Sequence, residues 1–203
     1  MLMKNMKALL APAFFAAALA GCHPGPSAED VNKEATANRS ATNQTTMIQV
    51  RFLDDKGLPG PLTSTPRVVK TDAEWRKQLT ADQYAITRGK GTEAAFCGAF
   101  YDQHKPGVYE CVCCGLPWFT SEAKFDSGTG WPSFFQPVAK ENVLEEPDHS
   151  GGMDRTEILC ARCGAHLGHV FDDGPRPTGL RFCLNSAALV FKENHNLKDG
   201  TAK

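Results

Sequence analysis

Two pairs of cysteines in this chain have the spacing of metal-binding knuckles. Each pair is a Cys-x-x-Cys followed directly by Gly, and Gly permits the tight turn that directs both thiolates at one ion. Two such pairs predict one closed, tetrahedral four-sulfur zinc site, which is structural rather than catalytic. In an oxidising compartment, the alternative is that these cysteines form disulfides. The predicted zinc ligands are Cys111, Cys114, Cys160 and Cys163.

Three further cysteines are candidates for redox chemistry. The chain has eight cysteines. Four are the predicted zinc ligands, and Cys22 belongs to the N-terminal export signal described below. Cys97, Cys113 and Cys183 remain. Cys183 lies in the short apolar run RFCL, where Arg181 would lower the pKa of the thiol if it were close enough. A cysteine in such a run is also commonly a small buried apolar residue. The run alone therefore leaves a nucleophile and a packing residue as open alternatives.

Two histidines and one tryptophan have side chains suited to binding and proton transfer. His166 and His169 follow the second knuckle, and an imidazole titrates close enough to neutral pH to act as a general acid. The same histidines could equally be ordinary surface residues. Trp131 stands in a Gly-rich loop, where an aromatic side chain faces either a ligand pocket or the core.

Three sequence runs resemble the methionine-R-sulfoxide reductase family. They are FDSGTGWPSFF, CARCGAHLGHVFDDGPRPTGLRFCLNSAALVF and TEAAFCGAFYD, and the resemblance spans about residues 72–192. It implies a mainly β domain of two antiparallel sheets with short N-terminal helices. It also implies site roles: the nucleophile Cys183, imidazoles around the sulfoxide oxygen from His166 and His169, a polar group from Asn185, a wall for the substrate methyl from Trp131, and zinc ligation by the four knuckle cysteines.

The resemblance also implies a second thiol that regenerates the oxidised Cys183, and this chain differs from many family members in where such a thiol could be. Many members carry a recycling cysteine where this chain has Thr129, while others place one upstream, where Cys97 stands. Cys97 is therefore the predicted resolving residue, with Cys113 or direct reduction of Cys183 as alternatives. The implied substrate is methionine-R-sulfoxide in oxidised proteins, and the implied reductant is a thioredoxin-like protein.

The N-terminus has the pattern of an export signal. Lys4 and Lys7 precede an apolar stretch at 8–20 that is too short to span a bilayer. It ends in LAGC, which resembles the lipobox of bacterial lipoproteins, so residues 1–21 are the predicted signal peptide and Cys22 the predicted lipid anchor. His23 stands where Asp often retains lipoproteins at the inner membrane, which favours a periplasm-facing position at the outer membrane. An ordinary signal peptide cut nearby is the alternative.

The rest of the chain divides by composition. Residues 22–46 are polar and predict a flexible tether, while 47–70 begin like a strand but contain several prolines, so we expect an irregular segment of unknown role. Capping boxes beginning at Thr71 and Thr80 predict two short helices at the start of a reductase domain spanning 71–203. Short apolar runs between turn residues predict strands at 108–111, 156–160, 169–171, 181–184 and 188–191.

Composition narrows the function classes. A chain of 203 residues, 41% hydrophobic, has room for one ordinary domain and an appended segment, and we expect a monomer. A net charge of −1 gives no basic footprint for nucleic acid. Two alternatives to a reductase remain: a zinc-ribbon binding module with Cys183 buried, and a thiol–disulfide oxidoreductase acting through Cys-x-x-Cys. The second needs a free thiol pair and a βαβ pattern, which the sequence lacks.

Overall fold

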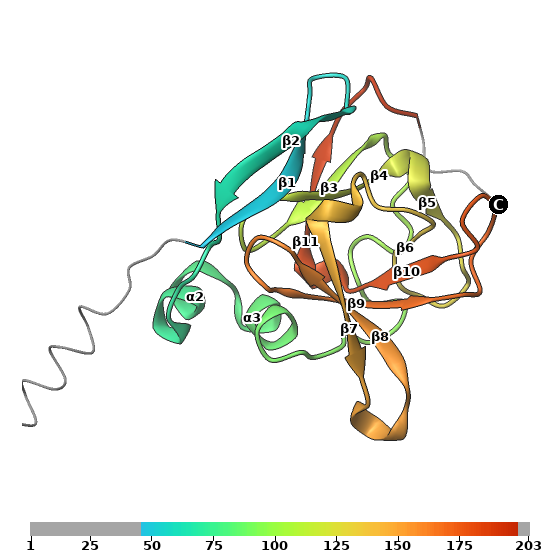
Figure 1. The fold of residues 1–203 in the computed structure, drawn as a ribbon. Helices are drawn as coiled ribbons and strands as arrows, with labels where there is room; N and C mark the ends of the chain where they lie inside the picture. The colour runs from blue at the N-terminus through green and yellow to red at the C-terminus, as the bar shows by residue number, and fades with distance from the viewer. Residues whose placement is uncertain (1–45, 199–203) are drawn as a thin grey trace, which may run out of the picture. The chain divides into compact units, whose positions relative to one another are not determined.

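Antiparallel strands make up most of the regular secondary structure of the described chain (Figure 1). The structure is a computed structural model that describes residues 46–198. The predicted signal peptide, Cys22 and nearly all of the predicted tether lie outside the described residues. Within the described range, no helix is long and apolar enough to cross a membrane.

The strands form two larger sheets and one hairpin. The six-stranded sheet has the order β5 (Lys124–Phe125), β6 (Ser133–Phe134), β10 (Arg181–Leu184), β9 (His166–Phe171), β8 (Arg155–Cys160) and β7 (Val143–Asp148). The three-stranded sheet has the order β11 (Leu189–Glu193), β3 (Gly107–Cys111) and β4 (Pro117–Thr120). The prediction of a mainly β, antiparallel domain with short N-terminal helices is confirmed.

Aromatic side chains join the two larger sheets. Phe119 on β4 stacks on Phe134 of β6 with ring centroids 4.6 Å apart, and it lies 5.5 Å from Phe182 of β10. Tyr109 on β3 meets Phe134 edge-on at 4.9 Å. Because side chains alternate along a strand, a core-facing Phe182 directs its neighbour Cys183 to the opposite face of the six-stranded sheet. Core packing thereby positions the predicted nucleophile.

Both predicted helices form where the capping boxes place them. Thr71 caps α2 (Asp72–Gln78) with Glu74 as its reciprocal partner, and Thr80 caps α3 (Ala81–Thr87) with Gln83. Trp75 anchors α2 in the core. Four single 3-10 turns complete the described helical structure: η1 (Ser121–Ala123), η2 (Lys140–Asn142), η3 (Ser150–Gly152) and η4 (Ser186–Ala188).

The segment expected to be irregular is instead a β-hairpin. Strand β1 (Met47–Leu53) pairs antiparallel with β2 (Pro59–Pro66) as a separate two-stranded sheet. The prolines are tolerated because each strand of a two-stranded sheet has an unpaired edge, where a missing N–H breaks no ladder bond. Val50 is fully buried, and the buried Asn142 side chain bonds to both the N–H and the C=O of Arg51. The expectation of irregular structure at 47–66 was therefore wrong.

Candidate active site and metal centre

Four cysteine sulfurs converge between the turn after β3 and the turn after β8. The ligand atoms of Cys111, Cys114, Cys160 and Cys163 all lie within 4.8 Å of one another. The Cys111–Cys163 and Cys114–Cys160 sulfur pairs are 3.6 and 3.5 Å apart. A tetrahedral ion with Zn–S bonds of about 2.3 Å holds its sulfurs roughly 3.8 Å apart, so the geometry fits a four-sulfur metal site.

The turns that carry these cysteines are built for this convergence. Gly115 and Gly164 have φ of +71° and +67°, a backbone conformation that favours glycine. Each donates its N–H to the carbonyl of the first cysteine of its knuckle at 2.8 Å. All the described cysteines are free thiols, so the predicted disulfide alternative does not form in this structure. The thiol of Cys113 is buried against Cys111 and Cys163, which places it at the metal centre.

Cys183 lies at the centre of a row of paired residues. Strand β10 lies between β6 and β9, and Cys183 pairs directly with Ser133 on one side and His169 on the other. His169 in turn pairs with Glu157 on β8. Directly paired residues of antiparallel strands project to the same face of the sheet. A hydroxyl, a thiol, an imidazole and a carboxylate therefore stand side by side across four strands.

A small cavity opens beside this row. Its volume is about 130 Å³, and four predicted site residues line it: Trp131, His169, Cys183 and Asn185. The remaining lining residues are Thr92, Arg155, Gly168, Phe171 and Leu184. The size and the mixture of one aromatic wall with a few polar groups are typical of a site for a short side chain.

The surroundings of Cys183 shift the pKa of its thiol upward. Burial raises its pKa, and this effect exceeds the opposing influence of the nearby Arg181 charge and of hydrogen bonds to Thr129, Ser133 and Arg181. Arg181 therefore lowers the pKa of Cys183, as the sequence predicted, but the net shift of that pKa is upward. Arg181 is also neutralised in part because Asp173 accepts two hydrogen bonds from its guanidinium, at 2.7 and 2.9 Å.

Asn185 and Trp131 are both fixed by the backbone of one residue, Glu93. Asn185 Oδ1 accepts from the Glu93 N–H at 3.0 Å, and Trp131 Nε1 donates to the Glu93 C=O at 3.1 Å. The Glu93 carboxylate accepts from the N–H groups of Ser186 and Ala187. Glu93 therefore holds the segment that borders the cavity, a role that no local sequence pattern indicates.

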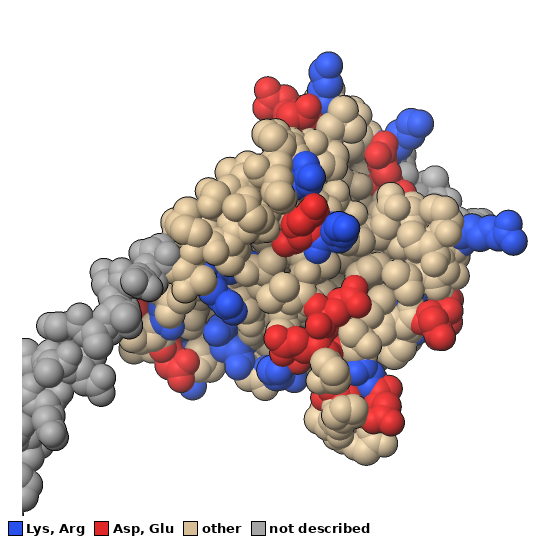
Figure 2. All heavy atoms as spheres, viewed as in Figure 1, with Lys and Arg blue, Asp and Glu red and all other residues tan. Residues whose placement is uncertain are grey.

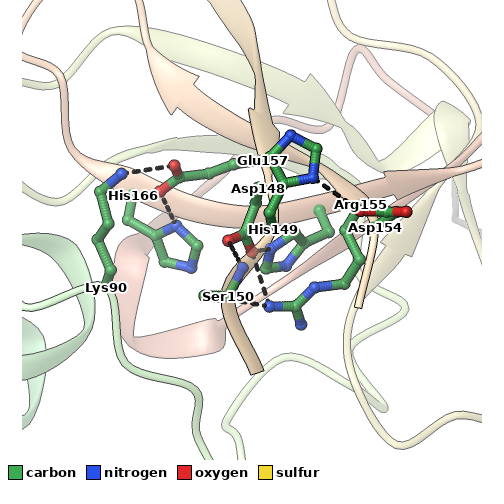
Figure 3. A network of polar contacts seen from close by, with 9 residues as sticks. Lys90, Asp148, His149, Ser150, Asp154, Arg155, Glu157 and His166 are labelled. Carbon is green, nitrogen blue, oxygen red and sulfur yellow. Dashed lines mark hydrogen bonds and ion pairs between the residues drawn. The ribbon is translucent and has the colours of Figure 1, made fainter. Parts of the chain in front are cut away.

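Each predicted catalytic histidine has a carboxylate partner, and Figure 3 shows the pair formed by His166 and Glu157. His166 Nδ1 lies 2.7 Å from Glu157 Oε1, and His169 Nε2 lies 2.8 Å from Asp148 Oδ2. A regular strand directs residues three apart to opposite faces, but β9 has a register shift opposite Leu159 that interrupts this alternation. The two imidazole rings consequently lie 5.6 Å apart. His169 lines the cavity, whereas His166 is buried behind it.

Cys97 lies outside this cavity. It is an exposed thiol that lines a separate cavity of about 690 Å³, between α3, the 91–100 segment and η4. Thr92 lines both cavities. The N–H of the adjacent Phe96 donates to the carbonyl of Gly130, which precedes Trp131. The structure thus places Cys97 in a neighbouring part of the molecule but does not bring it to Cys183.

Comparison with known proteins gives the family. The SelR domain model matches residues 79–193, which is more than half of the chain. The peptide methionine sulfoxide reductase MsrB of Hahella chejuensis is 61% identical over 137 residues, covering 68% of this chain and 96% of the relative. The MsrB of Herminiimonas arsenicoxydans is 54% identical over 135 residues, covering 66% and 98%. This chain belongs to the MsrB family.

Family membership decides between the open interpretations of the site. As an MsrB family member, the chain is a thiol-dependent oxidoreductase. The family resemblance expected from the sequence runs is confirmed. A zinc-ribbon module without catalysis is correspondingly disfavoured, because the match covers the cavity and Cys183 as well as the knuckles.

Proposed function

We propose that this protein reduces the R epimer of methionine sulfoxide in oxidised proteins, with Cys183 as the nucleophile. The observation that carries the proposal is the shared cavity, in which the Cys183 thiol, the His169 imidazole and the Trp131 ring surround one small space. Sulfoxide reduction needs a thiol for the sulfur, a proton donor for the oxygen and an apolar contact for the methyl group. These three groups meet those needs.

The proposed chemistry transfers one oxygen atom from substrate to enzyme. Cys183 attacks the sulfoxide sulfur while His166 or His169 protonates the sulfoxide oxygen, which otherwise leaves poorly. The substrate S–O bond breaks and a new S–O bond forms on Cys183, giving methionine and a sulfenic acid. The proton lost by the Cys183 thiol balances the proton taken up by oxygen. Because burial raises the pKa of the Cys183 thiol, we expect its ionisation to accompany substrate binding.

Stereoselectivity follows from the arrangement of the cavity. If Trp131 contacts the terminal methyl and the histidines hold the oxygen, only one configuration at sulfur presents the sulfur to Cys183. The S epimer exchanges the positions of methyl and oxygen, which places the oxygen against the indole. The proposed preference is therefore for the R epimer.

Recycling requires a second thiol and an external reductant. We propose that Cys97 condenses with the Cys183 sulfenic acid, releasing water and forming a disulfide. A thioredoxin-like dithiol then reduces this disulfide by exchange. The exposure of Cys97 supports the proposal because an external reductant must reach the disulfide. Since Cys97 lies in a separate cavity, disulfide formation requires the 91–100 segment to move.

The metal is proposed to be one structural zinc ion. Four sulfur ligands with near-tetrahedral spacing match zinc preferences and leave no open position for a substrate. Cys111, Cys114, Cys160 and Cys163 would hold it, joining β3 and β8 away from the cavity.

The subcellular location is proposed from the N-terminal sequence alone. A lipid on Cys22 would anchor a monomeric, periplasm-facing reductase at the outer membrane, where oxidised exported proteins are its substrates. Detergent partitioning of wild type and Cys22→Ala tests the anchor. Loss of the variant from the detergent phase supports it, and unchanged partitioning contradicts it.

One assay tests the proposed activity. Wild type and Cys183→Ser are compared on the separated R and S epimers of a blocked methionine sulfoxide, with a dithiol as reductant. Wild type should reduce the R epimer only, and Cys183→Ser should reduce neither. Activity that survives in Cys183→Ser, or a preference for the S epimer, contradicts the proposal.

A further inference from the structure

His166 and His169 are each bound to a carboxylate, but through opposite ring nitrogens. Glu157 binds Nδ1 of His166, whereas Asp148 binds Nε2 of His169. A cation supports each carboxylate: Lys90 Nζ lies 2.6 Å from Glu157 Oε2, and Arg155 donates to Asp148 Oδ2 at 2.7 Å (Figure 3). The two histidines are thus held in complementary orientations, with a different nitrogen left open on each ring.

The contact to Glu157 determines where His166 carries its hydrogen. Lys90 Nζ donates to Glu157 Oε2, and a carboxylate paired with an ammonium group can only accept hydrogen bonds. His166 Nδ1 must therefore be the donor. Both side chains are almost completely buried, with exposed fractions of 3% and 5%, so water does not compete for this bond.

The other nitrogen of His166 is buried and has no partner in the described part of the chain. Nε2 has neither a protein hydrogen bond nor solvent contact. A buried polar atom without a partner costs about 1–3 kcal/mol, so such atoms are usually satisfied unless a ligand or a water supplies the partner. The ring lies edge-on to His169, which lines the cavity. A water in that space, or the substrate oxygen once Nε2 is protonated, would supply the partner that Nε2 lacks.

We propose that Glu157, supported by Lys90, is a positioning residue that holds His166 with hydrogen on Nδ1, so that Nε2 is the nitrogen that gains a proton and passes it to the substrate oxygen. The inference rests on the proposed function. It concerns a residue of β8 that lies outside the cavity and acts only through His166. A carboxylate behind an imidazole stabilises the protonated ring and selects one tautomer, which is the established use of such pairs.

The charges around His166 give the direction of the expected effect. Burial lowers its pKa, Glu157 opposes this, and the neighbouring His169 and Lys90 add to the lowering. Removing the Glu157 charge should lower the pKa of His166 further. If protonated His166 is the acid, the limb on which kcat decreases with rising pH should move to lower pH.

The test compares Glu157→Gln with wild type and with Glu145→Gln. Acidic side chains gather over β7 (Figure 2), and Glu145 is an exposed carboxylate of that strand, paired with Ile158 next to Glu157. Two readouts are taken: the pH profile of kcat and KM on the R epimer, and the ¹⁵N shifts of the His166 ring nitrogens. Glu157→Gln should lower kcat about 10- to 100-fold with little change in KM, shift the profile and redistribute the ring hydrogen. Glu145→Gln should match wild type.

Several outcomes would overturn the inference. A lower kcat with an unchanged pH profile and unchanged ring-nitrogen shifts would mean that Glu157 only supports the fold. A neutral wild-type His166 whose single ring hydrogen is on Nε2 would contradict it directly. If Glu157→Gln does not fold, Glu157→Asp, which withdraws the carboxylate from Nδ1, carries the same test. Wild type inactive on the R epimer would instead reject the proposed function, while the nitrogen shifts would still test the orientation of His166.

Discussion

The Thr129 hydroxyl lies near the Cys183 thiol and lowers the pKa of that thiol. Thr129 is also linked to Ser127, whose hydroxyl lies 2.8 Å from Thr129 Oγ1 and 2.8 Å from Ser133 Oγ. Cys183 therefore faces a small cluster of hydroxyls on the 127–133 loop. A thiol at position 129 would be close enough to react with Cys183, whereas a hydroxyl can only stabilise it.

Thr129→Cys should therefore create a local resolving thiol. In a Cys97→Ser background, one turnover should leave a disulfide between Cys183 and the introduced thiol in place of a sulfenic acid. Peptide mapping detects the disulfide, and a sulfenate-specific trap such as dimedone should label the background protein but not the variant. Ser127→Cys, whose parent hydroxyl bonds Thr129, is the control and should retain most of the label. Persistent trapping in Thr129→Cys would contradict the placement.

Removing the metal should destabilise the fold without direct loss of a catalytic group. Cys160→Ser should bind less than half an equivalent of zinc and lower the Tm by about 10 °C or more, because 1 kcal/mol shifts the Tm of a domain this size by about 2–4 °C. Metal analysis and calorimetry measure both effects. Cys97→Ser removes an exposed thiol and should leave Tm and metal content unchanged. Full stability of a metal-free Cys160→Ser would show that the site is dispensable.

Asp148 should make stability depend on acid pH. Hydrogen bonds from the Ser150 hydroxyl and N–H, and from His169, hold its pKa below the usual range. Because the folded pKa is lower than the unfolded value of about 3.9, the stabilisation is complete above that value and is lost as pH falls toward the folded pKa. The stability difference between wild type and Asp148→Asn should accordingly shrink below about pH 4 in denaturant titrations.

The control for this effect is Asp154→Asn. Asp154 is an exposed residue near the tip of the same β7–β8 hairpin, where a surface ion pair contributes little. Its replacement should leave the stability curve close to wild type across the pH range. An Asp148→Asn difference that stays constant down to pH 2 would rule out the expected linkage.

Trp131 should contribute mainly to substrate binding. Trp131→Ala removes the aromatic wall of the cavity and should reduce kcat/KM for the R epimer by about 10- to 200-fold, the range expected for lost apolar contact in a pocket. Trp131→Phe keeps a ring but loses the Nε1 bond to Glu93, so its loss should be smaller. Steady-state kinetics on both epimers measure the effect. Equal losses in the two variants would assign the role to the hydrogen bond instead.

Local patterns predicted those parts of the fold whose cause is itself local. The capping boxes at Thr71 and Thr80 each involve residues three apart, and both form as expected. The strand containing Cys183 and the convergence of the knuckle cysteines also follow from short motifs. These features depend on neighbouring residues or on a metal that four cysteines specify.

The supporting residues of the site could not be predicted because tertiary pairing creates them. Glu157 and Asp148 reach the histidines across strands β7, β8 and β9, and a register shift brings the two rings together. Glu93 acts through its backbone on Asn185 and Trp131 and through its carboxylate on the Ser186 and Ala187 N–H groups, and all four contacts join residues far apart in the sequence. Strand β6 has only two residues, too few for a periodic pattern. The prolines of β2 concealed a strand with an unpaired edge.

The Asn142 side chain has a consequence for how this enzyme can be shortened. It makes hydrogen bonds to the N–H and C=O of Arg51 and to the C=O of Pro117, so it fastens the β1–β2 hairpin to the three-stranded sheet. A truncated protein limited to the family-matched residues 79–193 would bury this amide with two of its three bonds broken and would uncover the surface that Val50 covers. The hairpin therefore belongs to the folding unit, which begins before residue 79, where the SelR match starts.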